Sequence, residues 1–300
     1  MREELFKNCT LCPRKCNVNR LEGKRGYCGM DSTIRAARAA LHMWEEPCIS
    51  GKKGSGAVFF SGCGLRCCFC QNRDIAIGDS GKEISVERLA EIFLELQEKG
   101  AANLNLVTGA HYVPHIISAL ELARGKGMNL PVVYNSSGYE SVETIRRLDG
   151  YVDVYLPDMK YMEPELAAAF SNARDYPQVA QSAIAEMLRQ TGPCQFTENG
   201  YIKRGTIVRH LILPGHTKNS IAVLKYLYRT YGEDIFISVM NQYTPVWKNE
   251  KFPELNRKVT RREYEKVLDA AIELGIENGY FQEGETAEES FIPAFDYEGV

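Results

Sequence analysis

The chain has 300 residues, of which 44% are hydrophobic and 25% are charged, and its formal net charge is −3. This composition is ordinary for a globular protein, and the small negative charge argues against a general nucleic-acid or anionic-membrane surface. No apolar run approaches transmembrane length, and residues 1–9 lack the apolar core of a signal peptide. We therefore expect a cytoplasmic protein without membrane association, whose ten cysteines serve metal or redox chemistry rather than disulfides.

The first cysteine group lies in residues 9–28 with the spacing C-x2-C-x3-C-x11-C, formed by Cys9, Cys12, Cys16 and Cys28. Four thiolates this close in sequence can surround one tetrahedral ion or one cubane cluster. Few apolar residues are present to order the segment, so a metal would contribute much of its stability. The sequence predicts a metal site here, and zinc and iron–sulfur remain equal alternatives.

The next residues favour a division of the chain into two parts. Asp31–Trp44 is rich in alanine, which predicts a helix, and Glu45–Gly56 contains proline and several glycines, which indicates a linker. Residues 1–50 are thus expected to form a Cys-rich segment with a linker helix, and residues 51–300 the main domain with a C-terminal helical tail.

A second cysteine group follows a short apolar run, Ala57–Phe60, which predicts a buried strand. Cys63, Cys67 and Cys70 have the spacing C-x3-C-x2-C, and Cys68 is expected to point elsewhere because it is adjacent to Cys67. Three thiolates are one short of the four that normally close a cubane cluster, so one iron would stay open to a ligand. A structural zinc loop, or buried cysteines without metal, is the alternative.

Strands and helices then alternate, which predicts a parallel sheet with right-handed crossovers and an open barrel of six strand–helix units. The further strands are expected at Asn103–Val107, Pro131–Tyr134, Val152–Leu156, Thr206–Leu213 and Ile235–Met240. The helices are expected after Ser85 up to Gly100, and at Pro114–Ala123, Val142–Leu148, Glu165–Phe170, Gln178–Arg189, Ile221–Tyr231 and from Thr260 through Leu274.

Polar side chains recur where these strands end, and ligands of such folds gather at the carboxyl ends of the strands. This ring of loops suits a zwitterionic nucleoside ligand held on a metal cluster. The predicted cofactor contacts are Thr108, Gly109, Asn135, Ser136, Ser137, Asp158, Lys160, Arg209, His216 and Gln242.

The cysteine loop resembles the signature of the radical S-adenosylmethionine enzymes. The stretches C-Q-N-R-D-I, Y-N-S-S-G-Y, D-M-K-Y-M and V-R-H-L-I-L-P-G-H-T are similar to the glycyl-radical activases, and closer still to relatives that carry C-x-L-C-P-R-x-C ahead of the barrel. The resemblance covers nearly the whole chain. It implies a partial (β/α)6 barrel in which three cysteines hold a [4Fe-4S] cluster whose open iron binds S-adenosylmethionine.

The resemblance also implies residue roles. Asp158, Lys160 and Arg209 would contact S-adenosylmethionine, and Asn135, Ser136 and Ser137 would lie near its ribose. The activases have a G-G-E turn for the methionine amino group, whereas this chain reads T-G-A-H-Y there, without an acid.

The implied activity is that of an oxidoreductase. Reductive cleavage of S-adenosylmethionine releases methionine and a 5′-deoxyadenosyl radical, which removes hydrogen from a substrate. A protein or peptide is the expected substrate, with glycyl-radical activation as the leading case, and a flavodoxin or ferredoxin is the electron donor by analogy. The alternatives are an iron–sulfur electron carrier or redox sensor, and an RNA-modifying radical enzyme, although the charge gives no sign of a nucleic-acid surface.

Overall fold

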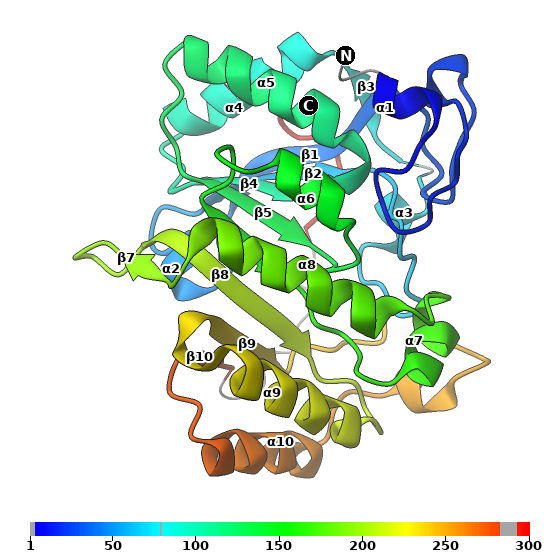
Figure 1. Ribbon diagram of the computed structural model, residues 1–300, viewed down its shortest axis with the longest axis vertical. Helices are drawn as coiled ribbons and strands as arrows, with labels where there is room; N and C mark the ends of the chain where they lie inside the picture. Colours follow the sequence, from blue (N-terminus) through cyan, green and yellow to red (C-terminus); the bar gives the residue numbers. More distant parts are fainter. Residues whose placement is uncertain (1–3, 79, 283–292) are drawn as a thin grey trace.

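A computed structural model describes residues 4–78, 80–282 and 293–300. Its centre is a curved sheet with the strand order β10-β9-β8-β6-β5-β4-β2-β1-β3, and β7 pairs with β8 beside this path. The strands from β2 to β10 along this order are parallel, while β1 and β3 run antiparallel to their neighbours. Because the order ends at β3 and β10 among the described residues, the sheet is an open barrel, as predicted (Figure 1).

The strands agree with the six predicted ones and add others. Their bounds are β1 Ile34–His42, β2 Ser55–Phe60, β3 Lys82–Ile84, β4 Leu104–Val107, β5 Val132–Ser136, β6 Val154–Pro157, β7 Gln195–Phe196, β8 Ile202–Leu211, β9 Phe236–Met240 and β10 Gly279–Phe281. The strand β10, which is parallel to β9, was missed in the sequence because it is short and has no alternating pattern.

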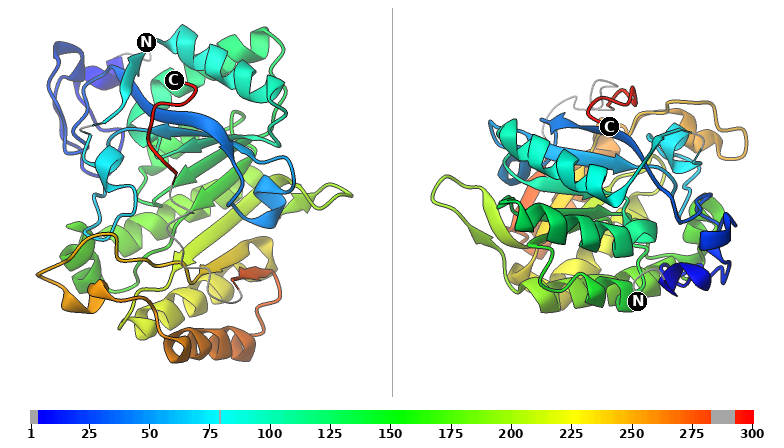
Figure 2. Two further views of the ribbon diagram at one scale, coloured as in Figure 1. Left: turned by 180° about the vertical axis from the view of Figure 1, so that it is seen from behind. Right: turned by 90° about the horizontal axis from the view of Figure 1, so that it is seen from above.

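Helices cover the outer face of the sheet (Figures 1 and 2). The α-helices are α1 Glu4–Lys7, α2 Pro47–Ser50, α3 Arg73–Ala76, α4 Val86–Glu98, α5 Val113–Gly125, α6 Val142–Arg147, α7 Pro164–Ser171, α8 Tyr176–Thr191, α9 Thr217–Tyr231 and α10 Arg261–Leu274. The 3-10 helices are η1 Arg20–Glu22, η2 Ala110–Tyr112, η3 Gly232–Asp234 and η4 Pro253–Asn256. The predicted starts of two helices are confirmed: Ser85 accepts from the Arg88 amide before α4, and Thr260 and Glu263 form a capping box before α10. None of the described helices is long and apolar enough to cross a membrane.

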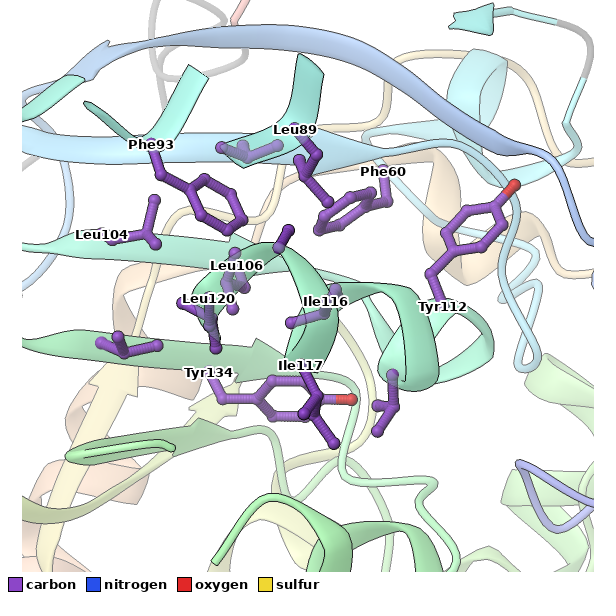
Figure 3. Close-up of a cluster of buried hydrophobic side chains, with 14 of the residues drawn as sticks. Phe60, Leu89, Phe93, Leu104, Leu106, Tyr112, Ile116, Ile117, Leu120 and Tyr134 are labelled. Atoms are coloured by element: carbon purple, nitrogen blue, oxygen red, sulfur yellow. The ribbon is translucent and has the colours of Figure 1, made fainter. Parts of the chain in front are cut away.

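The largest core cluster lies between the sheet and two helices, α4 and α5. Figure 3 shows Phe60 and Leu106 from the strands packing against Phe93 and Leu120 from these helices. All four side chains are at most 1% exposed. Burying an aromatic or leucine side chain contributes about 1.5–3 kcal/mol, so this layer fixes the strands whose carboxyl ends carry the candidate site.

The predicted helix over Asp31–Trp44 is wrong, because Ile34–His42 forms strand β1. β1 pairs with β2 on one edge, and on the other edge Ala39 N donates to Glu298 O at 2.8 Å and Tyr297 N donates to Ala37 O at 3.1 Å. The C-terminal residues therefore run beside β1 (Figure 2). Tertiary pairing on both edges overrides the helix propensity of alanine, and β1 joins the same sheet as the barrel strands.

The amino end of the barrel interior is closed by apolar side chains. Cys48 and Ile49 of α2 pack there against Val133, Leu156 and Ile207, which point inward from β5, β6 and β8. These side chains fill that end of the interior.

Candidate cofactor site

Three cysteines of the loop after β2 line one cavity of about 450 Å³. These are Cys63, Cys67 and Cys70. The Leu65 amide donates to Cys63 Sγ at 3.4 Å, and the Ser171 hydroxyl at the end of α7 donates to Cys67 Sγ at 3.1 Å. The loop thus gathers three thiols at the mouth of the barrel and already supplies hydrogen bonds to two of them.

The neighbouring Cys68 lies outside this cavity lining, as the sequence predicted. It lines a neighbouring surface pocket with Trp247 and Lys251, which Cys67 and Cys70 also border, and Trp247 Nε1 donates to its backbone oxygen at 3.2 Å. Cys68 therefore serves as an internal comparison for the three cavity cysteines.

Burial raises the pKa of two of the three cavity thiols, those of Cys67 and Cys70. The pKa of Cys67 rises to about 11, mainly by burial, although the nearby Lys160 cation opposes this shift. The pKa of Cys70 is also raised, first by burial and then by the neighbouring Cys67 and Cys63. Metal binding requires thiolates, so a metal at this loop would displace protons from thiols that otherwise hold them firmly.

The turn after β6 carries an ion pair on the same cavity. Lys160 Nζ lies 2.5 Å from Asp158 Oδ2. Burial disfavours the charged form of Lys160, but the Asp158 carboxylate outweighs this effect and the pKa of Lys160 lies above its ordinary value. Tyr176 holds the turn in place, because its hydroxyl accepts from the Lys160 amide at 2.9 Å and donates to Asp158 O at 2.9 Å.

The ends of β4 and β5 add neutral polar groups to the cavity, namely Thr108, Asn135, Ser136 and Ser137, and Gln242 follows β9. Thr108 has a φ of 61°, a left-handed conformation that is uncommon for residues other than glycine. Its amide donates to Asn135 O at 2.9 Å. Strained residues of this kind concentrate at functional sites, which agrees with a role of this turn in ligand binding.

The predicted contact Arg209 also lines the cavity, but two carboxylates that the sequence analysis missed hold it. Arg209 Nε donates to Glu46 Oε1 at 2.8 Å, and its Nη2 donates to Glu46 Oε2 at 2.6 Å and to Glu45. Burial opposes ionisation of Glu46, but the guanidinium outweighs it and lowers the pKa of that carboxyl. In the sequence, only the lack of an acid in the T-G-A-H-Y turn hinted that carboxylates of the site could come from another segment.

Two predicted contacts lie outside the cavity lining. A Cβ on Gly109 would stand 2.6 Å from Ile116 Cδ1, so this residue packs against α5. His216 precedes α9, with its ring 5.1 Å from that of Phe170 and its Nε2 3.6 Å from Glu254 Oε1. The cavity therefore gives no support to cofactor roles for Gly109 and His216.

The N-terminal cysteines come together beside the cysteine loop. The Cys12 thiol lies near those of Cys9 and Cys28, and the Cys28 thiol also lies near that of Cys16. Burial raises the pKa of Cys12 to about 12. Within the described residues, however, no three His, Cys, Asp or Glu side chains are arranged to hold a single metal ion. The positive φ angles of Lys15 (41°) and Asn17 (55°) show that the backbone is tightly turned around the first three cysteines.

Arginine side chains dock this segment onto the barrel. Arg14 donates to Gly64 O at 2.8 Å in the cysteine loop and to Ser171 O at 3.0 Å in α7. Fully buried Arg20 donates to His111 O at 2.6 Å in η2. Cys12 Sγ approaches Gly64 closely enough that a Cβ there would stand 3.5 Å from it. The N-terminal segment accordingly lies at the carboxyl ends of the strands, near α3 and α7 (Figure 1).

The arrangement defines a class of protein: an open parallel barrel whose strand ends present three thiols, an ion pair and amides to one cavity. A profile described as "Radical SAM superfamily" matches residues 57–227. The chain therefore belongs to the radical S-adenosylmethionine superfamily, and the family implies a [4Fe-4S] cluster and S-adenosylmethionine as cofactors.

Two relatives show how far the sequence similarity extends. "Uncharacterized protein MJ0674" of Methanocaldococcus jannaschii is 30% identical over 276 residues, which cover 90% of this chain and 75% of that protein. "Pyruvate formate-lyase-activating enzyme" of Clostridium pasteurianum is 27% identical over 113 residues, 36% of this chain and 46% of that protein.

Solved structures superpose only loosely. "Streptococcus suis SuiB bound to precursor peptide SuiA" has a TM-score of 0.47 at 13% identity and covers 75% of this chain and 47% of that chain. "Native anSMEcpe with bound AdoMet" has a TM-score of 0.48 at 12% identity and covers 71% of this chain and 57% of that chain. The chain spans about half the length of these structures, and they carry no argument about its substrate.

The residues present fit the implied cofactors. Sulfur ligands select iron–sulfur centres, and three cysteines on one loop leave the fourth position of a cubane open. The Asp158–Lys160 pair and the amide groups beside it match the mixed charges and hydroxyls of S-adenosylmethionine.

Proposed function

We propose that the chain binds a [4Fe-4S] cluster through Cys63, Cys67 and Cys70, and S-adenosylmethionine beside it. When bound, these cofactors supply a 5′-deoxyadenosyl radical by one-electron reductive cleavage. The supporting observation is that the three cysteines, the Asp158–Lys160 pair and Arg209 all line one cavity. A ferredoxin or flavodoxin would supply the electron. The ten free cysteines, all within the described residues, are consistent with a cytoplasmic location.

The residues of this chain would bind and orient the cofactor. Lys160 and Asp158 offer a cation and a carboxylate for the methionyl group, and Asn135, Ser136 and Ser137 offer polar groups for the ribose. Positioning is a large part of such catalysis, because the cofactor carries the difficult chemistry and the protein excludes competing reactions. The apolar plug at the amino end of the barrel would keep water from entering behind the cofactor.

For the substrate we propose a peptide or protein backbone, with activation of a glycyl-radical enzyme as the leading case. The activase-like stretches and the 27% identity to a pyruvate formate-lyase-activating enzyme support this proposal. The open sheet supports it too, because an incomplete barrel gives a substrate loop wider lateral access than a closed one.

The test of this function is electron paramagnetic resonance on the reduced protein with S-adenosylmethionine and a candidate glycyl-radical enzyme from the same cell. We expect a stable glycyl doublet on the partner and stoichiometric 5′-deoxyadenosine. Deuterium transfer from a small metabolite into 5′-deoxyadenosine, with no radical on any protein, would instead assign a different substrate class.

We further propose that Cys9, Cys12, Cys16 and Cys28 bind a second metal, zinc or iron–sulfur, in a closed site. The tight turn around these residues and their mutual proximity support this, because strained loops persist where other bonds hold them. Each thiol would have to lose its proton on metal binding.

Metal analysis tests this second site. The triple variant Cys63→Ala, Cys67→Ala, Cys70→Ala should retain iron or zinc after reconstitution, and adding Cys12→Ser should remove most of it. A triple variant that holds neither metal would rule out the second site.

A further inference from the structure

A basic surface pocket borders the cysteine loop. It has a volume of about 520 Å³ and is lined by this loop, by α3 and by residues 247–251, which follow β9. Its charged lining residues are Arg66, Arg73, Lys248, Lys251 and Glu250. Apart from the cysteines, four cations and one carboxylate give the described lining a net charge of +3, whereas the whole chain carries −3. The positive charge is therefore concentrated at this place.

The four cations of this pocket are not neutralised by neighbouring acids. Within the part of the chain that the structure describes, none of them forms an ion pair. The Arg73 guanidinium instead lies over the Trp247 ring, 5.2 Å from its centroid. Elsewhere on the surface arginines are paired, as Arg174 is with Glu165. Unneutralised charges of one sign create a potential that attracts an oppositely charged partner, here an acidic one.

The pocket reaches two of the thiols that line the cofactor cavity. Cys67 and Cys70 border both spaces. The Trp247 ring is joined to the same loop, because its Nε1 donates to Cys68 O at 3.2 Å, one residue after Cys67. A molecule in this pocket would therefore lie close to the proposed cluster ligands. Electron transfer slows steeply with the distance between two redox centres, so a carrier is expected to dock where that distance is short.

Apolar side chains lie among the cations of the pocket. Ile77, which is 37% exposed, and Trp247 both line it. Protein interfaces combine apolar and aromatic contacts with a polar rim, and tryptophan and arginine are enriched in them. A nucleic acid would also be attracted to such a surface, but the position of the pocket against Cys67 and Cys70 favours a redox protein.

We infer that this basic pocket is the docking surface for an acidic ferredoxin that reduces the cluster. The inference rests on the proposed function, because it names the partner and the surface through which the cluster of the same loop receives its electron. One electron leaves the iron–sulfur centre of the ferredoxin, which is oxidised, and enters the cluster, which is reduced. No bond forms or breaks, and no proton moves.

A ferredoxin matches both the reaction and the surface. It transfers single electrons at a low reduction potential, as the one-electron cleavage of S-adenosylmethionine requires. The four cations contact carboxylates of the ferredoxin, and this attraction raises the rate at which the two proteins meet. Complexes of electron-transfer proteins are small and weak, which agrees with a docking surface of limited size.

Binding of an oxidised plant-type [2Fe-2S] ferredoxin to the reconstituted protein tests the docking surface. Isothermal titration calorimetry should give a Kd at least about tenfold higher at about 300 mM NaCl than at about 50 mM. The variant Lys248→Glu, Lys251→Glu should raise the Kd at low salt at least about tenfold. The matched control Lys52→Glu, Lys53→Glu makes the same change in net charge at exposed residues before β2, whereas the cysteine loop follows β2. It should change the Kd by less than about threefold.

Reduction of the cluster by the same ferredoxin, followed by stopped-flow absorbance, measures the consequence of docking. The variant Lys248→Glu, Lys251→Glu should lower the second-order rate constant at least about tenfold. Excess dithionite should nevertheless reduce the cluster completely in this variant and in the unsubstituted protein. Complete reduction by dithionite shows that the variant is folded and holds its cluster.

Four results would overturn the inference: no binding of the ferredoxin, a Kd independent of salt, an unchanged Kd in the Lys248→Glu, Lys251→Glu variant, or tighter binding of a flavodoxin or a single-stranded RNA than of the ferredoxin. The first three concern binding alone and need no turnover. Failure of the proposed function would appear separately, as a reconstituted protein without a cluster that dithionite reduces, or without 5′-deoxyadenosine after that reduction.

Discussion

Replacing any one of Cys63, Cys67 or Cys70 by alanine is expected to reduce 5′-deoxyadenosine formation to the background of a protein-free reaction. Each thiol faces the same cavity, and a three-thiolate cluster has no spare ligand to replace a lost one. The measurement is 5′-deoxyadenosine by liquid chromatography after anaerobic reconstitution and reduction, with iron content determined on the same samples.

Cys68→Ala is the matched control, because Cys68 lies on the same loop but outside the cavity lining. Its activity and iron content should remain close to those of the unsubstituted protein. Full activity in Cys70→Ala would contradict the assignment, and loss confined to Cys68→Ala would mean that the wrong thiols have been named.

Gly138→Ala is expected to lower the free energy of unfolding by about 2–5 kcal/mol and to weaken S-adenosylmethionine binding. Gly138 has a φ of 74°, and the left-handed region costs other residues about 1–2 kcal/mol. A Cβ at this position would also overlap the backbone oxygen of Asp158, and overpacking of this kind costs about 1–3 kcal/mol. The turn that carries Asp158 and Lys160 must therefore move. Urea denaturation and equilibrium dialysis with S-adenosylmethionine measure the two effects.

The variant Gly127→Ala measures the cost of placing alanine at a positive φ without the steric overlap that occurs at Gly138. Gly127 has a φ of 97° but no atom within 4 Å of an added Cβ, so only the conformational cost of about 1–2 kcal/mol applies. It should leave cofactor binding unchanged. If the two variants prove equally stable and bind S-adenosylmethionine equally well, Gly138 does not position Asp158.

The barrel could be predicted from the sequence because its strands are short apolar runs separated by amphipathic helices, of which α4 and α10 have side-chain caps. Ser85 and Thr260 mark helix starts by a local hydrogen bond, which sequence spacing reveals directly. Strand β1 could not be predicted, because its pairing partners, β2 and the residues near Glu298, are fixed only once the chain has folded. Alanine has no side chain large enough to reveal such pairing by an alternating pattern.

Part of the cavity lining could also be predicted from the sequence. Residues at strand ends converge in any parallel barrel, so Asp158, Lys160 and Asn135 could be placed together from order alone. Glu45 and Glu46 could not, because they lie in a linker more than a hundred and fifty residues before their partner Arg209. Nothing in the spacing of the linker indicates that it enters the barrel. The contact of Cys12 with Gly64 could not be predicted either, because it depends on how Arg14 docks the N-terminal segment.

The most direct test of the radical chemistry is a single assay on the unsubstituted protein. The protein is reconstituted anaerobically with iron and sulfide, reduced, and incubated with S-adenosylmethionine, and 5′-deoxyadenosine and methionine are quantified together. We expect both products in equal amounts, dependent on reductant and on iron. A fully reconstituted and reduced protein that binds S-adenosylmethionine but releases neither product would contradict the proposed function.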